Sequence, residues 1–223
     1  MNHRAGKLVV FEGIDGSGKS TQFDMLRTHL AHEGKNFRRI SFPRYNEPSS
    51  ALLKMYLGGE FGKEPNSVNA YAASTFFTVD RIASYLKDWK AFYEDGGLVM
   101  TDRYTTSNAI HQGAKIPHNE RKRFFDWLYE YEFDFIELPK PDCVIYFDID
   151  AKHAAERIEA RQAKTNAAVD IHEADFDYLV QCAKSGLEAA EHYGWKTIHC
   201  FDGGHERTVE EVRADVMDIF STL

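Results

Sequence analysis

Cysteine is scarce in this chain, and the three that occur are far apart. Cys143, Cys182 and Cys200 are the only ones among 223 residues. They form neither a disulfide framework nor a metal-ligand cluster, and they are typical of reduced thiols in a cytoplasmic protein. No apolar run approaches the roughly 20 residues that a membrane-spanning helix needs, and no secretory signal is visible. We therefore expect a cytoplasmic protein that does not span a membrane.

Proline is also scarce, and the chain has no excess of positive charge. The chain has 6 prolines and 15 glycines and contains no Pro-rich linker, low-complexity tract or repeat. We therefore expect a single domain over residues 1–223, with room for a small lid. A content of 43% hydrophobic and 28% charged residues is ordinary for a globular protein. The formal net charge of -8 argues against broad nucleic-acid binding.

What the sequence does have is an alternation of short apolar runs and helical segments. The runs typical of buried strands are Leu8–Phe11, Arg39–Phe42, Leu98–Met100, Val144–Phe147 and Thr197–Phe201. We expect helices at Lys19–His32, Ser67–Glu94, His118–Phe135, Lys152–Lys164, Ala174–Tyr193 and Val209–Phe220. This alternation predicts an α/β fold with a parallel sheet whose strands are covered on both faces.

The first strand leads into GIDGSGKST, a stretch with the spacing of a phosphate-binding loop. Glycines let such a loop curl tightly and turn its N–H groups inward, and the following helix adds its positive N-terminal end. Lys19 is expected to reach the β- and γ-phosphates, and the Ser20 hydroxyl to ligate Mg²⁺. A glycine-rich turn without a ligand is the alternative. The predicted ATP-binding residues are Gly13, Asp15, Gly16, Ser17, Gly18, Lys19, Ser20 and Thr21.

Two acidic positions stand where phosphates are expected. Asp15 lies inside the loop, where a triphosphate repels a carboxylate unless a metal or a substrate hydroxyl uses it; a turn-forming role is the alternative. Asp102 and Arg103 end the third strand, and ligands of open α/β sheets bind outside the carboxyl ends of strands. Asp102 is therefore a second candidate ligand for Mg²⁺, and Arg103 a candidate for binding phosphate. An ordinary surface ion pair is the alternative for these two residues.

Six motifs in this sequence together resemble those of thymidylate kinases. They are FEGIDGSGKSTQ (11–22), FPRY (42–45), FFTVDR (76–81), DRYTTSNAIHQGAK (102–115), LPKPD (138–142) and DIHEAD (170–175). They run in the family's order and at its spacing over nearly the whole chain. The resemblance implies a P-loop kinase fold, with a five-stranded parallel sheet flanked by helices and a short helical lid over roughly residues 157–172. It also implies Mg²⁺-dependent transfer of a phosphoryl group from ATP to dTMP, giving dTDP and ADP.

The resemblance also implies how dTMP is held opposite ATP. Phe77 stacks on thymine, Arg81 bonds the edge of the base, and Arg103 binds the phosphate. Asp15 contacts the deoxyribose 3′-OH and orients Arg103. Alternatives are a core Phe77 beside a solvated Arg81, and a helix-capping role for Asn108. The predicted dTMP-binding residues are Asp15, Phe42, Pro43, Arg44, Tyr45, Phe77, Arg81, Arg103, Asn108, His111, Gln112 and His172.

Two positions depart from the pattern of the family. Some members carry arginine where Tyr45 stands, whereas here the arginine is Arg44, one residue earlier. Tyr45 can instead donate its hydroxyl to the phosphate. His111 occupies a position near the sugar where relatives often have a tyrosine that helps to reject a 2′-hydroxyl. The smaller histidine predicts weaker discrimination against ribonucleotides.

The lid is expected to be cationic. Arg157, Arg161 and Lys164 fall at i, i+4 and i+7 and share one helix face, where unrelieved like charges cost roughly 0.2–0.5 kcal/mol. Family members with glycine at the position of Gly16 supply a transition-state arginine from the lid, so Arg161 is the first candidate and Arg157 the second. A solvated face beside neighbouring glutamates is the alternative. The predicted catalytic residues are Lys19, Asp15, Arg103, Arg161 and Arg157.

Two other functions remain open on the sequence alone. A deoxynucleoside kinase or another nucleoside monophosphate kinase shares the loop and the Asp-Arg pair, although the FPRY motif counts against it. A P-loop protein that senses or hydrolyses nucleotide without transferring phosphate is an alternative of another class. The family usually forms homodimers, so we expect a homodimer.

Overall fold

A five-stranded parallel sheet forms the centre of the protein. The computed structural model describes residues 6–165 and 175–223. The strands are β1 (Lys7–Glu12), β2 (Phe37–Ser41), β3 (Leu98–Asp102), β4 (Cys143–Asp148) and β5 (Lys196–His199). They are ordered β2-β3-β1-β4-β5, so β1 is central. Its side chains are almost all buried because helices cover both faces of the sheet. The predicted fold class is confirmed.

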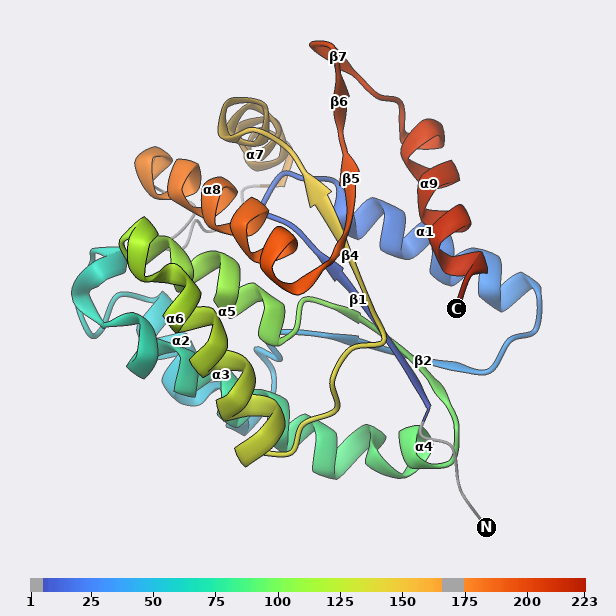
Figure 1. The fold of residues 1–223 in the computed structure, drawn as a ribbon, viewed down its shortest axis with the longest axis horizontal. Helices are drawn as coiled ribbons and strands as arrows, with labels where there is room; N and C mark the ends of the chain where they lie inside the picture. The colour runs from blue at the N-terminus through green and yellow to red at the C-terminus, as the bar shows by residue number, and fades with distance from the viewer. Residues whose placement is uncertain (1–5, 166–174) are drawn as a thin grey trace.

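Helices cover the two faces of the sheet unequally (Figure 1). They are α1 (Lys19–His32), α2 (Ala51–Leu57), α3 (Ala70–Ser84), α4 (Lys90–Glu94), α5 (Thr105–His111), α6 (His118–Tyr129), α7 (Ala151–Thr165), α8 (Phe176–Tyr193) and α9 (Val209–Ser221). Helices α1 and α9 pack on one face, and α3, α5, α6 and α8 lie on the other. Helix α7 begins three residues after β4 and lies beyond its carboxyl end. Because most helices cover the faces of the sheet, its carboxyl edge is bordered by the connecting loops and by α7.

Most of the predicted elements are present, with differences at their ends. The predicted helix Ser67–Glu94 is a run from Ala70 to Glu94 that contains one π-helical turn at Tyr85–Trp89. The short helices α2 and α5 were not predicted. The predicted strand Thr197–Phe201 is divided, because β5 ends at His199 and a small hairpin of β6 (Phe201–Asp202) and β7 (His205–Glu206) follows.

Aromatic packing fixes the phosphate loop at both of its ends. Phe11, next to the end of β1, packs edge-on against Phe23 of α1 with ring centroids 5.2 Å apart. On its other side it stacks on Phe147 of β4 at 5.9 Å. All three side chains are buried. The strand before the loop and the helix after it are therefore held together by one cluster, which sets the position of the loop between them.

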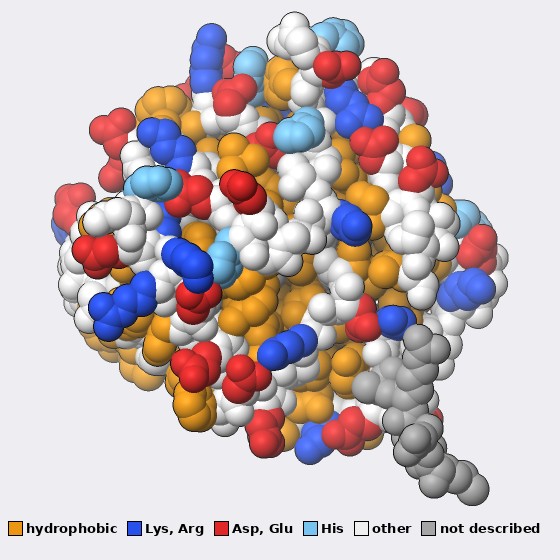
Figure 2. Space-filling view, in the orientation of Figure 1, with side chains coloured by type: hydrophobic (Ala, Val, Ile, Leu, Met, Phe, Trp, Pro, Cys, Tyr) orange, Lys and Arg blue, Asp and Glu red, His pale blue; other side chains and the backbone are white. Residues whose placement is uncertain are grey.

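The visible surface carries charges of both signs. On the face drawn in Figure 2, Lys and Arg side chains are interspersed with Asp and Glu, and they form no extended basic area among the residues coloured there. Within residues 6–165 and 175–223, no helix combines the length and apolarity needed to cross a bilayer. Cys143, Cys182 and Cys200 are buried free thiols, as expected.

Candidate active site

The phosphate loop adopts backbone conformations that require its glycines. Gly16 and Gly18 have φ angles of 79° and 87°, in the left-handed region where a side chain is strained. A Cβ at Gly16 would lie 2.4 Å from the backbone oxygen of Ala154, so α7 packs directly on the loop. An arginine at position 16 would not fit without moving α7.

Lys19 begins α1 with its side chain inside the loop. Its Nζ lies 3.5 Å from the backbone oxygen of Ile14 and 3.7 Å from Oδ1 of Asp15. The side chain is only 7% exposed. Burial, and then the charge of Arg103, lower the pKa of Lys19. A buried cation with few strong partners is well suited to a phosphate anion, which would replace the solvation that the ammonium has lost.

Ser20 and Asp102 lie together at the carboxyl edge of the sheet. The Ser20 hydroxyl donates to Oδ2 of Asp102 at 3.2 Å. Oδ1 of Asp102 is buried and has no hydrogen-bond partner among the described residues. One hydroxyl and one carboxylate suit Mg²⁺, which is bound in kinases through one or two carboxylates together with phosphates and water. The described residues contain no group of three or more His, Cys, Asp or Glu that suits a metal held by protein alone.

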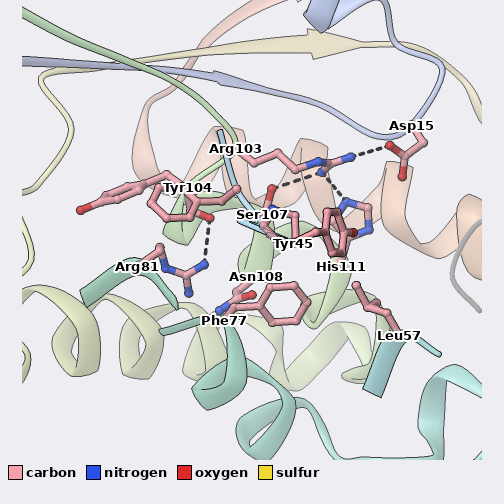
Figure 3. Close-up of a pocket in the computed structure, with 12 residues that line it drawn as sticks. Asp15, Tyr45, Leu57, Phe77, Arg81, Arg103, Tyr104, Ser107, Asn108 and His111 are labelled. Carbon is pink, nitrogen blue, oxygen red and sulfur yellow. Dashed lines mark hydrogen bonds and ion pairs between the residues drawn. The ribbon is translucent and has the colours of Figure 1, made fainter. Parts of the chain in front are cut away.

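A cavity next to the loop collects most of the predicted dTMP-binding residues (Figure 3). It is lined by Asp15, Phe42, Pro43, Tyr45, Leu57, Phe77, Arg81, Arg103, Tyr104, Ser107, Asn108 and His111. Every predicted dTMP-binding residue lines it except Arg44, Gln112 and His172. Asp15 and Arg103 lie at the end near the loop, and Phe77 and Arg81 lie at the other end. The cavity thus has a charged end beside the phosphate loop and an aromatic end further from it.

The three exceptions have different causes. The Arg44 guanidinium pairs with Glu47 at 3.3 Å and with Asp88 at 2.5 Å, and these carboxylates hold it out of the cavity lining. Gln112 is fully buried, and its amide has no hydrogen-bond partner among the described residues. His172 lies outside the described residues. The structure therefore does not bring Arg44 or Gln112 to the cavity.

Arg103 occupies the charged end of the cavity. Its φ of 67° is left-handed, a strained backbone conformation that is common at functional sites. One terminal nitrogen, Nη2, donates to Oδ1 of Asp15 at 2.6 Å. The other, Nη1, donates to Oγ of Ser107 at 3.2 Å and contacts Nε2 of His111 at 2.9 Å. Burial disfavours the ionised Asp15, but Arg103 and Lys19 outweigh it and hold the pKa of that carboxyl well below its usual range.

Glu12 is a buried carboxylate that the sequence analysis did not single out. It ends β1 and accepts hydrogen bonds from the hydroxyls of Thr106 at 2.7 Å and Ser107 at 2.9 Å and from the backbone N–H of Gly13 at 3.0 Å. Burial raises the pKa of Glu12, and the charge of Arg103 opposes this shift. The only signal in the sequence was a glutamate at the end of an otherwise apolar strand. Its contacts tie the loop to the start of α5.

Glu132 is the second buried carboxylate that was missed, and it holds Arg81. Nε of Arg81 donates to Oε2 of Glu132 at 2.7 Å, and Nη2 donates to Oε1. Glu132 also accepts from the hydroxyls of Thr105 at 2.6 Å and Thr78 at 2.9 Å. Arg81 is therefore not a solvated residue. Only its Nη1 is directed elsewhere, 3.5 Å from the backbone oxygen of Tyr104.

Phe77 and Asn108 complete the aromatic end of the cavity. Phe77 is half-buried, one turn before Arg81 on α3, and meets Tyr56 edge-on at 6.3 Å. Asn108 lies inside α5 instead of at its cap, and its amide nitrogen is 3.3 Å from the backbone oxygen of Ser74. Asn108 is therefore not a helix cap, and Phe77 both packs against a buried cluster that includes Tyr56 and lines the cavity. A flat ring and an amide beside a fixed guanidinium can recognise a planar base with a polar edge.

On the other side of the loop, α7 contributes Arg157. Its Nη1 donates to the backbone oxygen of Gly16 at 3.1 Å, and its Nη2 pairs with Glu206 of β7 at 2.5 Å. Arg161, one turn further along α7, is exposed. It lines neither the cavity of Figure 3 nor a second cavity on the other side of the loop. This second cavity is lined by Ser17, Gly18, Thr21, Gln22, Arg157, Cys200, Glu206, Arg207, Val209 and Val212. Of the two candidate lid arginines, Arg157 is therefore the one that contacts the loop.

The parallel sheet, the phosphate loop and the facing cavity are those of a P-loop nucleotide kinase. A family model described as Thymidylate kinase matches residues 11–215. The chain therefore belongs to the thymidylate kinase family, as the sequence motifs predict.

Several relatives agree with this assignment. The thymidylate kinase of Mycobacterium tuberculosis strain H37Rv is 32% identical over 190 residues, which cover 84% of this chain and 87% of the relative. The human thymidylate kinase is 30% identical over 158 residues, covering 70% and 68%. A solved structure of thymidylate kinase from Candida albicans superimposes with a TM-score of 0.69 over 98% of this chain and 92% of that one. At 22% identity, that structure supports the fold alone.

Proposed function

We propose that this protein transfers the γ-phosphoryl group of ATP to dTMP in the presence of Mg²⁺, giving dTDP and ADP. The observation that carries this proposal is the position of Arg103. Its guanidinium pairs with Asp15 of the phosphate loop and lines the same cavity as Phe77. One fixed cation is thus shared by the donor and acceptor sides, where two polyanions must be brought together.

The donor triphosphate binds to the loop from Gly13 to Thr21. The inward backbone N–H groups, the N-terminus of α1 and the buried Lys19 supply positive charge there. Ser20 and Asp102 would hold Mg²⁺, which would neutralise phosphate charge. The second cavity lies directly beside the loop, and we assign it to the base of the donor. Its lining is apolar at Val209 and Val212, which suits the face of a purine.

The acceptor nucleotide binds in the cavity of Figure 3. The thymine ring stacks on Phe77, with its polar edge toward Arg81 and Asn108. The 5′-phosphate lies at the other end, against Arg103 and the hydroxyl of Tyr45. A phosphate oxygen of dTMP then bonds to the γ-phosphorus while the bond to the β–γ bridging oxygen breaks, and ADP leaves with that electron pair. Catalysis of this step is mainly positioning and charge stabilisation.

The lid supplies the remaining positive charge. Arg157 already touches the loop at Gly16, and Arg161 follows one turn later on the same helix. We propose that α7 brings these side chains to the transferred phosphoryl group, where an arginine stabilises the charge of the transition state. Closure also excludes water and suppresses hydrolysis of ATP.

The decisive experiment compares acceptors and tests the loop lysine. We expect the wild-type enzyme to phosphorylate dTMP in preference to dUMP, dCMP and thymidine in a coupled assay with Mg²⁺ and ATP. Lys19→Ala should lower kcat by on the order of a thousandfold because preorganised charge on the phosphates is lost. The exposed Lys35→Ala is the matched control and should retain wild-type turnover.

Two outcomes would decide for the alternatives. Preference for thymidine over dTMP would identify a deoxynucleoside kinase. ATP turnover that is independent of any acceptor would identify a nucleotide-sensing or nucleotide-hydrolysing protein.

We also propose a homodimer and a cytoplasmic location. Val79 and Leu86 are seven residues apart along the α3 helical run, and 47% and 59% of their surfaces are exposed. Apolar exposure on one helix face is typical of an interface. Light scattering should give twice the mass of the chain, and Leu86→Glu should shift it toward one chain. The three buried free thiols are compatible with a reducing compartment.

A further inference from the structure

We propose that His111 is a positioning residue: its neutral imidazole accepts a hydrogen bond from Arg103 and fixes the guanidinium for the acceptor phosphate. This inference rests on the acceptor site proposed above. His111 and Ser107 are four residues apart on α5 and reach the same nitrogen, Nη1 of Arg103, at 2.9 Å and 3.2 Å. The two side chains form one face of the helix, and Figure 3 shows both of them directed at the guanidinium.

The chemistry of the two partners fixes the protonation state of His111. A guanidinium carries only donors, so a close contact between Nη1 and Nε2 requires a lone pair on Nε2. The single ring proton must then be on Nδ1. That nitrogen faces Sγ of Cys182 on α8 at 3.6 Å, and a sulfur atom is a weak acceptor. Burial raises the pKa of the Cys182 thiol, so the sulfur stays uncharged.

The other charged and titratable groups around the imidazole act in opposite directions. Asp15 of the loop attracts a positive charge at His111. Arg103 repels one, and it is the closer contact. Tyr178 of α8 donates its hydroxyl to the backbone oxygen of His111, which fixes the helix end without protonating the ring. Lys115, which follows α5, is desolvated, and its positive charge acts on the Cys182 thiol that His111 contacts.

Protonation of Nε2 would therefore undo the arrangement. The acceptor would become a donor, and two cations would face each other across 2.9 Å. Arg103 would keep its contacts with Asp15 and Ser107 but lose its contact with His111. The affinity for dTMP should therefore fall on acidification, once Nε2 takes up a proton. The phosphate of dTMP itself titrates near pH 6, so this effect must be separated from that of the substrate.

Two substitutions separate acceptor capacity from bulk. His111→Gln keeps an acceptor oxygen that does not titrate, and His111→Phe keeps a ring that accepts nothing. At about pH 8 we expect His111→Phe to raise the KM for dTMP about tenfold, as for a lost hydrogen bond to a charged group. We expect His111→Gln to raise it about threefold or less. The KM for ATP should stay within about twofold in both variants, because the contact lies on the acceptor side.

The pH profile is the sharper readout. Between about pH 8.5 and about pH 5.5, the wild-type KM for dTMP should rise more steeply than that of His111→Gln, because only the wild type loses an acceptor. The ratio of the two KM values cancels the titration of dTMP. A constant ratio, or equal losses in the Gln and Phe variants, would reduce His111 to a packing residue. A wild-type KM that instead improves on acidification would mean that a protonated His111 binds phosphate, and would overturn the proposal.

Nitrogen NMR tests the geometry without any assay of dTMP. In the nitrogen-labelled free enzyme, the ring signals of His111 are those that disappear in His111→Gln. They remain in the control variant, His32→Gln, which changes an exposed histidine. We expect an unprotonated Nε2 and a protonated Nδ1 near neutral pH. A proton on Nε2 would contradict the proposal even if dTDP is formed. If no dTDP is formed, the proposed function fails while this measurement still decides the role of His111.

Discussion

The acceptor and donor sides of the phosphate loop hold their arginines in different ways. Arg81, on the acceptor side, is 1% exposed, and its partner Glu132 is fully buried. Arg157, on the donor side, is 32% exposed, and its partner Glu206 is 57% exposed. The first guanidinium is fixed before any nucleotide binds. The second is held by a surface carboxylate that solvent or a phosphate can replace.

This difference fits the roles that we propose for the two sides. A base is recognised by shape and by hydrogen bonds, and a rigid pocket recognises it with less loss of conformational entropy on binding. An arginine that meets the transferred phosphoryl group must exchange partners during each cycle. Breaking a buried ion pair leaves an uncompensated charge, whereas an exposed pair contributes about 0–1 kcal/mol. We therefore use burial of the carboxylate partner to distinguish Arg81, which is held in place, from Arg157, which can exchange its partner.

The largest expected effect is on the buried side. Glu132→Ala leaves Arg81 buried without its carboxylate, and we expect a loss of about 3–5 kcal/mol in the free energy of unfolding. The matched change Glu206→Ala should cost less than about 1 kcal/mol. Urea denaturation of both variants measures the difference. Similar losses in the two variants would contradict the distinction between the two sides.

A milder change keeps the fold intact while testing the same pair. Glu132→Gln preserves an acceptor oxygen but removes the charge. If Glu132 positions Arg81, the KM for dTMP should rise in this variant while the KM for ATP stays close to that of the wild type.

Sequence reasoning found the local parts of the site and missed the parts that depend on distant residues. The phosphate loop is continuous in sequence, so its spacing alone specifies Lys19 and its neighbours. Glu132 is 51 residues from Arg81, within the run EYEFDF, which looks like an acidic helix surface. Nothing in that segment indicates burial until helix packing brings it against α3. Glu12 also depends on distant residues, because its hydroxyl partners Thr106 and Ser107 lie on α5.

Arg44 illustrates the opposite error. Its place in the FPRY motif put it among the predicted dTMP-binding residues, but Asp88, 44 residues away, pairs with it. The short helix α5 was missed because TTSNAIH has no apolar periodicity. Its position follows instead from buried contacts of its first turn to Glu12 and Glu132. Contacts of this kind cannot be read from spacing.

On the donor side, the lid arginines should affect turnover more than binding. Arg161→Ala should lower kcat by on the order of a hundredfold while raising the KM for dTMP much less, because the charge it stabilises exists only in the transition state. Arg157→Ala tests the second candidate in the same assay. The exposed Arg123→Ala on α6 serves as the control for loss of a surface charge. An unchanged kcat with raised KM values for both substrates would make Arg161 a surface charge.

Asp102 lies where the two sides meet, and its effect should be seen in the dependence on Mg²⁺. Asp102→Asn removes the anionic ligand but keeps the size of the side chain. We expect the apparent affinity for Mg²⁺ to weaken by about tenfold to a hundredfold. Activity titrated against Mg²⁺ at fixed ATP measures this shift. An unchanged titration with reduced kcat would assign Asp102 to orienting Arg103, its neighbour in the chain, instead of the metal.

The smallest effect should come from the exchangeable partner itself. Glu206→Gln removes the surface charge that competes with phosphate for Arg157, so the KM for ATP should fall by about twofold to fivefold, as for an exposed ion pair of 0.5–1 kcal/mol. The exposed Glu210→Gln on α9, with the same change of charge, should leave this KM unchanged. A rise in the KM for ATP in Glu206→Gln would mean that Glu206 holds Arg157 in its working position. The donor side would then be organised like the Arg81–Glu132 pair, and exposure of the partner would not distinguish the two sides.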